Sequence, residues 1–166
     1  MAFKEISVSE LSFNPFDKIS REWFLLTAGD EKGYNTMTAA WGFMGFMWGK
    51  NVIETVIRPS RHTIKFVEES PLFTVSFFDE DKRGALKFCG SHSGRDCDKA
   101  KETGLTPLFT DGTAAFEEAN LIFICRKLYA QDMEVSCLIP EEQGAFGSEA
   151  PHKAFIGEIV KVLVRE

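Results

Sequence analysis

The stretch Ala154-Phe-Ile-Gly-Glu-Ile-Val-Lys-Val-Leu-Val-Arg165 decides the fold class of this chain. Successive side chains of a β-strand point to opposite faces of its sheet. This stretch is apolar at both the even and the odd positions, as shown by Ile156, Val160, Val162, Val164 and by Phe155, Ile159, Leu163. Such a strand lies in the middle of a sheet or is covered on both faces. We therefore expect a mainly β fold with this strand inside it.

Runs rich in Val, Ile, Phe and Trp predict further strands, and turn residues separate them. The predicted strands are Trp23–Ala28, Asn35 to about Met44, Asn51–Ile57, Phe73–Phe77, and a hairpin of Leu121–Ala130 with Met133–Ile139. We expect a turn over Gly29–Gly33 and a loop over Gln143–Pro151.

Capping residues predict short helices between these strands. We expect a capped turn at Asn14–Asp17. A helix is expected over Thr63–Glu69, with Ser60 as its cap and its end before Pro71. Two more helices are expected over Asp81–Phe88 and Asp96–Thr103, with Gly104 just after the second. Six or seven strands joined mostly by short turns favour an antiparallel barrel with helices packed outside. With no linker in the sequence, we expect one domain over residues 1–166.

Composition excludes several classes of protein. A formal charge of −6 argues against a general nucleic-acid binder, although it permits a local basic pocket. No apolar run reaches the length of a membrane span, and the first residues lack the apolar core of a signal peptide, so we expect a cytoplasmic location. Aromatic residues make up 13% of the chain, with 16 Phe and 3 Trp, which indicates strands, a flat-ring ligand, or both.

Known site motifs are mostly missing. The four cysteines form no C-x-x-C pair, and Cys89, His92 and Cys97 lack the paired spacing of structural zinc, so we expect free thiols and no metal. We interpret Cys89 as a packed thiol. No G-x-G-x-x-G is present, and Gly45–Lys50 is one residue short of a P-loop, so a Rossmann or P-loop nucleotide site is not expected.

The first segment that could carry chemistry is Asn35-Thr-Met-Thr-Ala-Ala-Trp-Gly42. Its small and hydroxyl residues would let a planar ring lie against the strand, while Asn and backbone amides contact the ring's polar edge. The alternative is a core strand with one buried Trp.

The second segment is Arg58-Pro-Ser-Arg-His-Thr63. Two arginines, two hydroxyls and the start of a predicted helix supply the guanidinium, hydroxyl and backbone N–H donors that a phosphate requires. The alternative is a capped surface helix with solvated arginines.

The third segment is Cys89-Gly-Ser-His-Ser-Gly-Arg-Asp-Cys-Asp-Lys99. Its glycines allow close approach of a ligand to the backbone, its serines donate hydrogen bonds, and Arg95 and Lys99 add positive charge. The alternative is a flexible loop in which Asp96 caps a helix.

Together these segments resemble a known family. The order N-x-M-T-x-x-W, R-P-S-R-x-T, C-G-x-x-S-G-R-D-x-D-K and G-L-T-P is similar to that of the flavin reductase-like, FMN-binding split-barrel family, and of its flavoredoxin branch in particular. The resemblance extends from about Asn14 to Val164. It implies a six-stranded antiparallel Greek-key split barrel, a homodimer, and one FMN per subunit near the dimer interface.

The resemblance also implies roles for individual residues. The isoalloxazine ring would face Asn35, Met37, Thr38 and Trp41, and the ribityl chain and phosphate would be held by Arg58, Ser60, Arg61 and Thr63. The phosphate side would be closed by Ser91, Ser93, Gly94 and Lys99. His152 matches a catalytic His that reductases of this family place near the flavin and nicotinamide. Pro151 precedes it where many reductases have Gly-Asp, so an ordinary loop histidine is the alternative.

Three functions are compatible with this resemblance. The leading one is an NAD(P)H-dependent flavin oxidoreductase, with NADH or NADPH as co-substrate docking over the flavin because no Rossmann unit is present. The second is an FMN electron-transfer protein that a partner protein reduces. The third is a structural or storage barrel that binds another flat ring.

Overall fold

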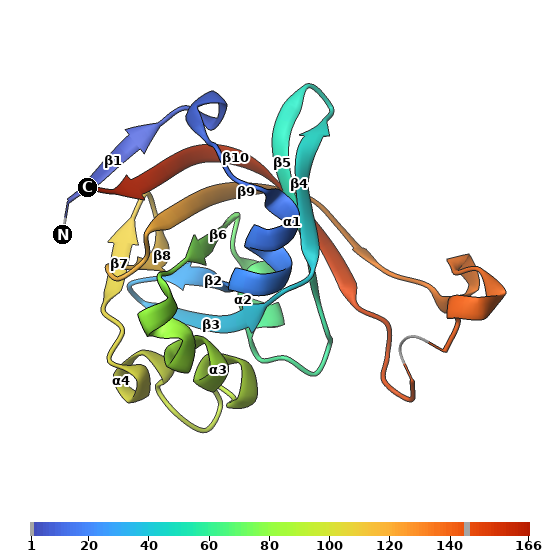
Figure 1. Cartoon of the computed structure of the whole chain (residues 1–166). Coiled ribbons are helices and arrows are strands. Elements are labelled where there is room, and N and C mark those ends of the chain that lie inside the picture. The colour runs from blue at the N-terminus through green and yellow to red at the C-terminus, as the bar shows by residue number, and fades with distance from the viewer. Residues whose placement is uncertain (1, 145–146) are drawn as a thin grey trace.

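The computed structural model describes residues 2–144 and 147–166. The last strand, β10 (Lys153–Arg165), pairs with β9 (Leu121–Asp132) on one side and β5 (Lys50–Ile57) on the other. Its final third also pairs with β1 (Phe3–Ile6). The central position expected from its sequence is confirmed (Figure 1).

The main sheet is antiparallel throughout. Its order is β3-β2-β6-β9-β10-β5-β4, where the strands not yet defined are β2 (Phe24–Asp30), β3 (Gly33–Ala39), β4 (Gly42–Met47) and β6 (Leu72–Phe77). A small second sheet joins β7 (Pro107–Thr110) to β8 (Thr113–Phe116). The mainly β, antiparallel split-barrel class is thus confirmed. The described residues contain ten strands, more than the six expected.

The strand predicted from Asn35 to Met44 is two strands. Pairing with β2 ends at Ala39, and β4 begins at Gly42 to pair with β5. Gly42 has a φ of 145°, and a Cβ there would lie 2.1 Å from the carbonyl oxygen of Glu54. Only glycine tolerates this geometry, so it allows the chain to leave one edge strand and start the other.

The strand predicted over Met133–Ile139 was wrong. The partner of β9 in its hairpin is β10, and residues 133–144 and 147–152 project from the body as part of their connection, which we call the arm (Figure 1). The arm holds two short 3₁₀ turns, Val135–Cys137 and Pro140–Glu142. β10 pairs with β9 from Leu121 to Asp132, so it takes the place that was predicted for residues 133–139. Of the loop predicted over Gln143–Pro151, residues 145–146 lie outside the described residues.

The helices follow the prediction with shifted ends. Helix α1 (Pro15–Asp17) is capped by Asn14, whose side chain accepts from the N–H of Phe16 at 3.0 Å, and a single π turn (Lys18–Glu22) follows it. Helix α2 (Thr63–Glu69) begins after His62, so the expected cap at Ser60 was wrong. A 3₁₀ turn (Glu80–Lys82) leads into α3 (Arg83–Ser91).

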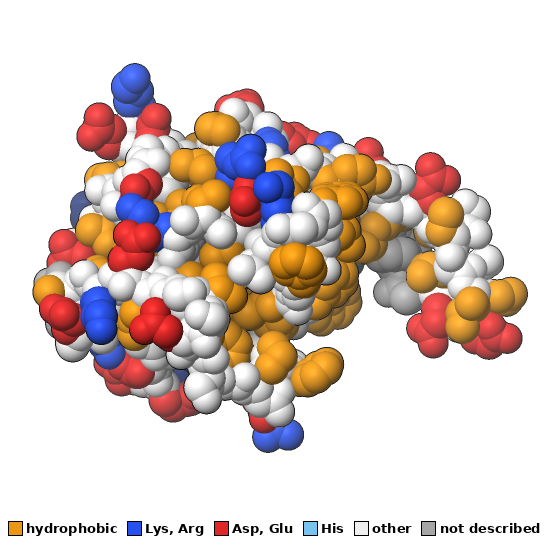
Figure 2. All heavy atoms as spheres, turned by 90° about the horizontal axis from the view of Figure 1, so that it is seen from above, with side chains coloured by type: hydrophobic (Ala, Val, Ile, Leu, Met, Phe, Trp, Pro, Cys, Tyr) orange, Lys and Arg blue, Asp and Glu red, His pale blue; other side chains and the backbone are white. Residues whose placement is uncertain are grey.

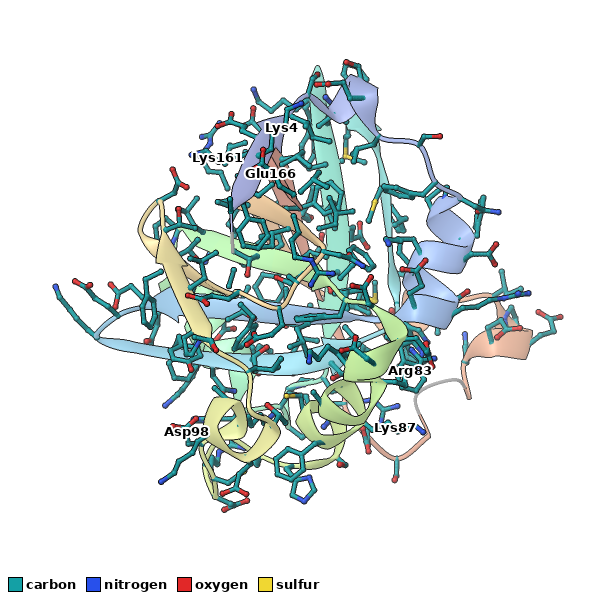
Figure 3. The ribbon with its side chains drawn as sticks, turned by 60° about the vertical axis from the view of Figure 1, so that its left-hand side comes forward. Lys4, Arg83, Lys87, Asp98, Lys161 and Glu166 are labelled. Carbon is teal, nitrogen blue, oxygen red and sulfur yellow. The ribbon has the colours of Figure 1, made fainter. Side chains whose placement is uncertain are left out.

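Helix α4 (Lys99–Thr103) is capped by Asp98, which accepts from the N–H of Lys101, rather than starting at Asp96. Gly104 ends it with a φ of 68°, as expected. Asp98 on the α4 side and Lys87 on α3 lie at one end of the molecule, and Lys4 and Lys161 lie at the other (Figure 3). The predicted site segments belong to the α3–α4 end.

Phenylalanine packing accounts for much of the aromatic content. The largest fully buried side chains include six Phe residues, namely Phe24, Phe73, Phe77, Phe116, Phe123 and Phe155. Gly157 lies against this core, and a Cβ there would stand 2.5 Å from the ring of Phe73. Such an overlap in a packed core is destabilising. Among the described residues, no helix has the length and apolar character needed to cross a membrane.

Candidate functional site: two adjoining hollows

A cationic hollow lies between the segment after β5 and the loop that joins α3 to α4. Its volume is about 230 Å³. It is lined by Met37, Arg58, Ser60, Arg61, His62, Thr63, Ser91, His92, Ser93, Arg95, Lys99 and Glu149. The lining has four basic side chains and four hydroxyls against one carboxylate. This composition suits a polyanionic group such as a phosphate.

A strand hollow of about 270 Å³ adjoins it. It is lined by Met37, Thr38, Ala39, Ala40, Trp41, Val56, Arg58, Arg61 and His152. Met37, Arg58 and Arg61 line both hollows, so the two adjoin. Small side chains at the end of β3 leave a flat strip of backbone, and the ring of Trp41, 58% exposed, stands at its end. This is a surface on which a planar ring can lie.

The structure brings together eleven of the thirteen residues predicted for the site. These eleven are Met37, Thr38, Trp41, Arg58, Ser60, Arg61, Thr63, Ser91, Ser93, Lys99 and His152. The other two, Asn35 and Gly94, line a third hollow that shares Lys99 with the cationic hollow.

Asn35 holds a wall of the cationic hollow in place through a hydrogen bond to Thr63. The side chain is 8% exposed, and its Nδ2 donates to Oγ1 of Thr63 at 2.8 Å. A Cβ at Gly94 would lie 2.0 Å from Oδ1 of Asn35, so the loop can approach the amide only with glycine there. Asn35 therefore connects β3, the start of α2 and the loop.

Lys99 lies in the floor of the cationic hollow. The residue is 6% exposed, and its Nζ donates to the carbonyl oxygens of Thr36 at 2.9 Å and Cys89 at 2.8 Å. Burial lowers its pKa, because the charged form loses hydration. Its ammonium group therefore ties β3 to α3 and adds positive potential beneath the hollow.

Two arginines join the walls of the hollow. Arg61 donates from Nη1 to the carbonyl oxygen of Gly90 at 2.8 Å. Arg95 donates from Nη1 to the carbonyl oxygen of Ser60 at 3.3 Å. Each guanidinium has five N–H donors, so these contacts leave others for a ligand. The segment after β5 and the loop after α3 thus hold each other in place.

Arg58 links the cationic hollow to the arm and to His152. Its Nη1 pairs with Oε2 of Glu149 at 2.5 Å, and its Nε lies 3.4 Å from Nε2 of His152. The His152 ring is 5.2 Å from the ring of Trp41. Burial lowers the pKa of His152, Arg58 lowers it further, and Glu149 opposes them. At neutral pH the imidazole is therefore uncharged.

Several lining residues were not predicted. Both His62 and Arg95 fall inside the quoted segments, but His62 was assigned no role and Arg95 was expected only to add positive charge. Glu149 carried no signal, because only the path of the arm brings it to Arg58.

Among the described residues, no cysteine lines the cationic hollow or the strand hollow. Cys89 is fully buried behind the loop, and burial raises the pKa of its thiol to about 11, with Lys99 opposing. A thiol of this kind is a packing residue. Among the residues with described positions, no group of three His, Cys, Asp or Glu side chains could hold a metal ion.

Comparison with known proteins identifies the family to which the chain belongs. A family model described as the flavin reductase like domain matches residues 16–166. No curated protein matches the sequence.

Solved structures show the same fold. Flavoredoxin of Desulfovibrio vulgaris (Miyazaki F) is 22% identical, with a TM-score of 0.70 over 98% of this chain and 76% of that one. An FMN-binding domain of a flavin reductases-like enzyme from Shewanella baltica OS155 is 16% identical (TM-score 0.69; 98% and 77%). An FMN-binding protein from Thermus thermophilus is 19% identical (TM-score 0.68; 94% and 79%).

The buried lysine gives a stability prediction. Lys99→Met keeps the aliphatic volume but leaves the carbonyls of Thr36 and Cys89 without their donor. We expect the free energy of unfolding to fall by about 1–3 kcal/mol, measured by urea denaturation followed by Trp fluorescence. Lys101→Met, the same change at an exposed position of α4, is the control and should change little. Equal free energies of unfolding for the two variants would contradict a stabilising role for the hydrogen bonds of Lys99.

Proposed function

The chain belongs to the flavin reductase like domain family, and from this premise we propose that it is an FMN-binding flavoprotein, acting as an NAD(P)H-dependent flavin oxidoreductase. The observation that carries the proposal is that two hollows adjoin, one cationic and rich in hydroxyls, the other bordered by the small and apolar side chains at the end of β3. FMN has the same division, with a phosphate at one end and a planar ring at the other. Solved structures with this fold include an FMN-binding domain and an FMN-binding protein.

The residues divide between the two ends of the ligand. In this proposal Arg58, Arg61, Ser60, Ser91 and Ser93 contact the phosphate and ribityl chain, and Met37, Thr38 and Trp41 contact the ring. The remaining four residues do not contact FMN in this proposal and instead hold the walls of the cationic hollow together through their polar or backbone groups. They are Asn35, Thr63, Gly94 and Lys99. This refines the expectation that all twelve contact FMN directly.

When bound, FMN supplies the capacity to accept a hydride or electrons and pass them on. The chain orients the ring, keeps water from one of its faces along β3, and provides positive charge through Arg58 and Arg61 near the boundary of the hollows. His152, neutral and held beside Arg58 and Trp41, borders the same space, and we propose it as the catalytic residue on the nicotinamide side.

A second candidate is an FMN electron-transfer protein that a partner protein reduces. The arm favours it, because Glu149 pairs with Arg58 at the mouth of the site, where an incoming dinucleotide would need that cation. The arm also presents exposed Ile139 with acidic Glu141 and Glu142, a surface suited to another protein. A flavoredoxin has the same fold.

The visible spectrum with and without nicotinamide cofactors separates these functions. We expect the purified protein, or protein given FMN, to show flavin absorbance that is lost on anaerobic mixing with NADH or NADPH. Flavin that persists with both donors would exclude the reductase and leave the electron-transfer protein. A colourless protein that also refuses added FMN would exclude both.

The phosphate end is tested by comparing two ligands. Arg61→Ala should weaken FMN binding by about 1–3 kcal/mol, because it removes a charge-assisted hydrogen bond, and should weaken riboflavin binding much less, because riboflavin lacks the phosphate. Affinities would come from quenching of flavin fluorescence. Arg21→Ala, at an exposed arginine paired with Asp17, is the matched control. Equal losses for both ligands would show that the phosphate lies elsewhere.

We further propose that residues 1–166 form one domain and that two copies associate. The β4–β5 hairpin exposes Phe43, Phe46, Met47 and Trp48, with Phe46 73% exposed. Figure 2 shows apolar side chains gathered on this face of the molecule, with others on the arm. An exposed apolar surface of this kind is typical of an interface, and Trp41 at the strand hollow is close to it in sequence. A second copy would therefore cover the open side of the ring.

The dimer is tested with a charge in the hairpin. Phe46→Asp should weaken self-association at least about tenfold, since an unpaired carboxylate in an apolar interface costs more than about 1.4 kcal/mol. Sedimentation over a concentration series would measure it. Phe109→Asp places the same charge on an exposed ring of β7, outside the hairpin, and should leave association unchanged. A wild-type protein that is monomeric at every concentration would contradict the proposal.

A further inference from the structure

Two histidines, His62 and His92, line the cationic hollow without a role in the proposed function so far, and His62 is the one whose ring has an unsatisfied buried nitrogen. It lies between Arg61 and Thr63 at the start of α2, and it lines the hollow. Its ring stands edge-on to Phe66 at 5.4 Å. The Nδ1 atom is buried, and no described residue provides it with a hydrogen bond. A buried ring nitrogen without a partner is costly, so His62 carries a polar atom that the described residues leave unsatisfied.

The charges around His62 are mostly positive. Lys65 lies on its own helix, Arg95 and Lys99 lie on the loop and helix opposite, and Asp96 is the neighbouring carboxylate. The remaining charged or titratable groups of the hollow are Arg58, Arg61, His92 and Glu149. Burial lowers the pKa of His62 most, Lys65, Arg95 and Lys99 lower it further, and Asp96 opposes them. In the free protein the ring is therefore neutral at neutral pH.

An anion in the hollow reverses this field. A phosphate monoester carries between one and two negative charges near neutral pH, and it would be held by the arginines within the space that His62 lines. The opposite charge then stabilises the imidazolium form, which has one N–H donor more than the neutral ring. The cations that keep His62 neutral in the free protein would be compensated at the same time.

We propose that His62 takes up a proton when a phosphate group binds in the cationic hollow, so that it serves as a proton-linked ligand of that phosphate. This inference rests on the proposed function, since it takes the phosphate to be that of FMN. In the free protein the pKa of His62 lies below the ordinary histidine value, and in the complex it is higher. In the window between these two pKa values, FMN binding becomes tighter as the pH falls. Above this window the ring is neutral in both states, and below it the ring is charged in both.

Histidine titration by NMR tests the proposal directly. The chain has three histidines, so His62→Gln assigns the His62 signal by its disappearance. We expect saturating FMN to raise the pKa of His62 by about one pH unit or more, equivalent to about a tenfold linkage in affinity. Riboflavin should leave it unchanged. A signal that stays in place with FMN, or that moves equally with riboflavin, would overturn the proposal.

Affinity measurements provide the second readout. From pH 8.5 to 6.5 the wild type should gain FMN affinity relative to His62→Gln by about three- to tenfold, a comparison that cancels protonation of the phosphate itself. His92→Gln changes a histidine in the same hollow whose Nδ1 already lies within hydrogen-bond distance of Ser91 and Phe88, and it should retain the wild-type dependence. Riboflavin binding by His62→Gln should match the wild type, which shows that the variant is folded. Loss of the dependence in His92→Gln and not in His62→Gln would contradict the assignment.

Inorganic phosphate separates this inference from the proposed function. If FMN binds but the His62 signal does not respond, the inference fails and the function stands. If FMN does not bind while inorganic phosphate still raises the pKa of His62, the function fails and the proton-linked anion site stands. Failure of both ligands to bind would overturn both.

Discussion

The buried ammonium group of Lys99 is the constraint on which the site depends. Its hydrogen bonds to Thr36 and Cys89 attach the middle of β3 to the end of α3. Asn35, one residue before Thr36, adds the bond to Thr63 at the start of α2. Three segments far apart in the sequence therefore meet at one point beneath the cationic hollow. A buried charge is costly unless it is well bonded, so the same contacts that stabilise Lys99 also fix the positions of the hollow's walls.

The two hollows divide the chemistry of the site. Positive charge is concentrated where hydroxyls and loop backbone accompany it, and the neighbouring end of β3 carries small side chains and no charge. Arg58 and Arg61 stand at the boundary, so a ligand bound across both hollows would place its anionic end and its flat end in matching surroundings. The chain as a whole carries a formal charge of −6. The local cations therefore favour an anion in this place without making the whole surface attractive to polyanions.

The β4–β5 hairpin and the arm are two exposed features of the molecule. The β4–β5 hairpin presents aromatic side chains. The arm projects from the body (Figure 1), and its residue Glu149 pairs with Arg58. Apolar side chains that remain exposed in a single chain are most simply explained by another surface that covers them. The arm and hairpin thus connect the chemistry of the hollows to whatever approaches them from outside.

The sequence by itself predicted the fold class and the central place of β10, because periodicity acts over neighbouring residues. Its resemblance to a family pointed to eleven of the residues that line the hollows. The sequence did not determine the break at Gly42, the irregular arm, or β1, β7 and β8, because these depend on which sheet edges remain unpaired. Within the site, Lys99 likewise shows what the sequence alone could not predict. Its charge and its place after a glycine-containing loop were visible in the sequence, which indicated a ligand contact. Only the tertiary structure decided that it is buried and bonded to two carbonyls, and that Glu149 and His62 belong to the same hollow, because burial and the electrostatic field arise from segments that are distant in the chain.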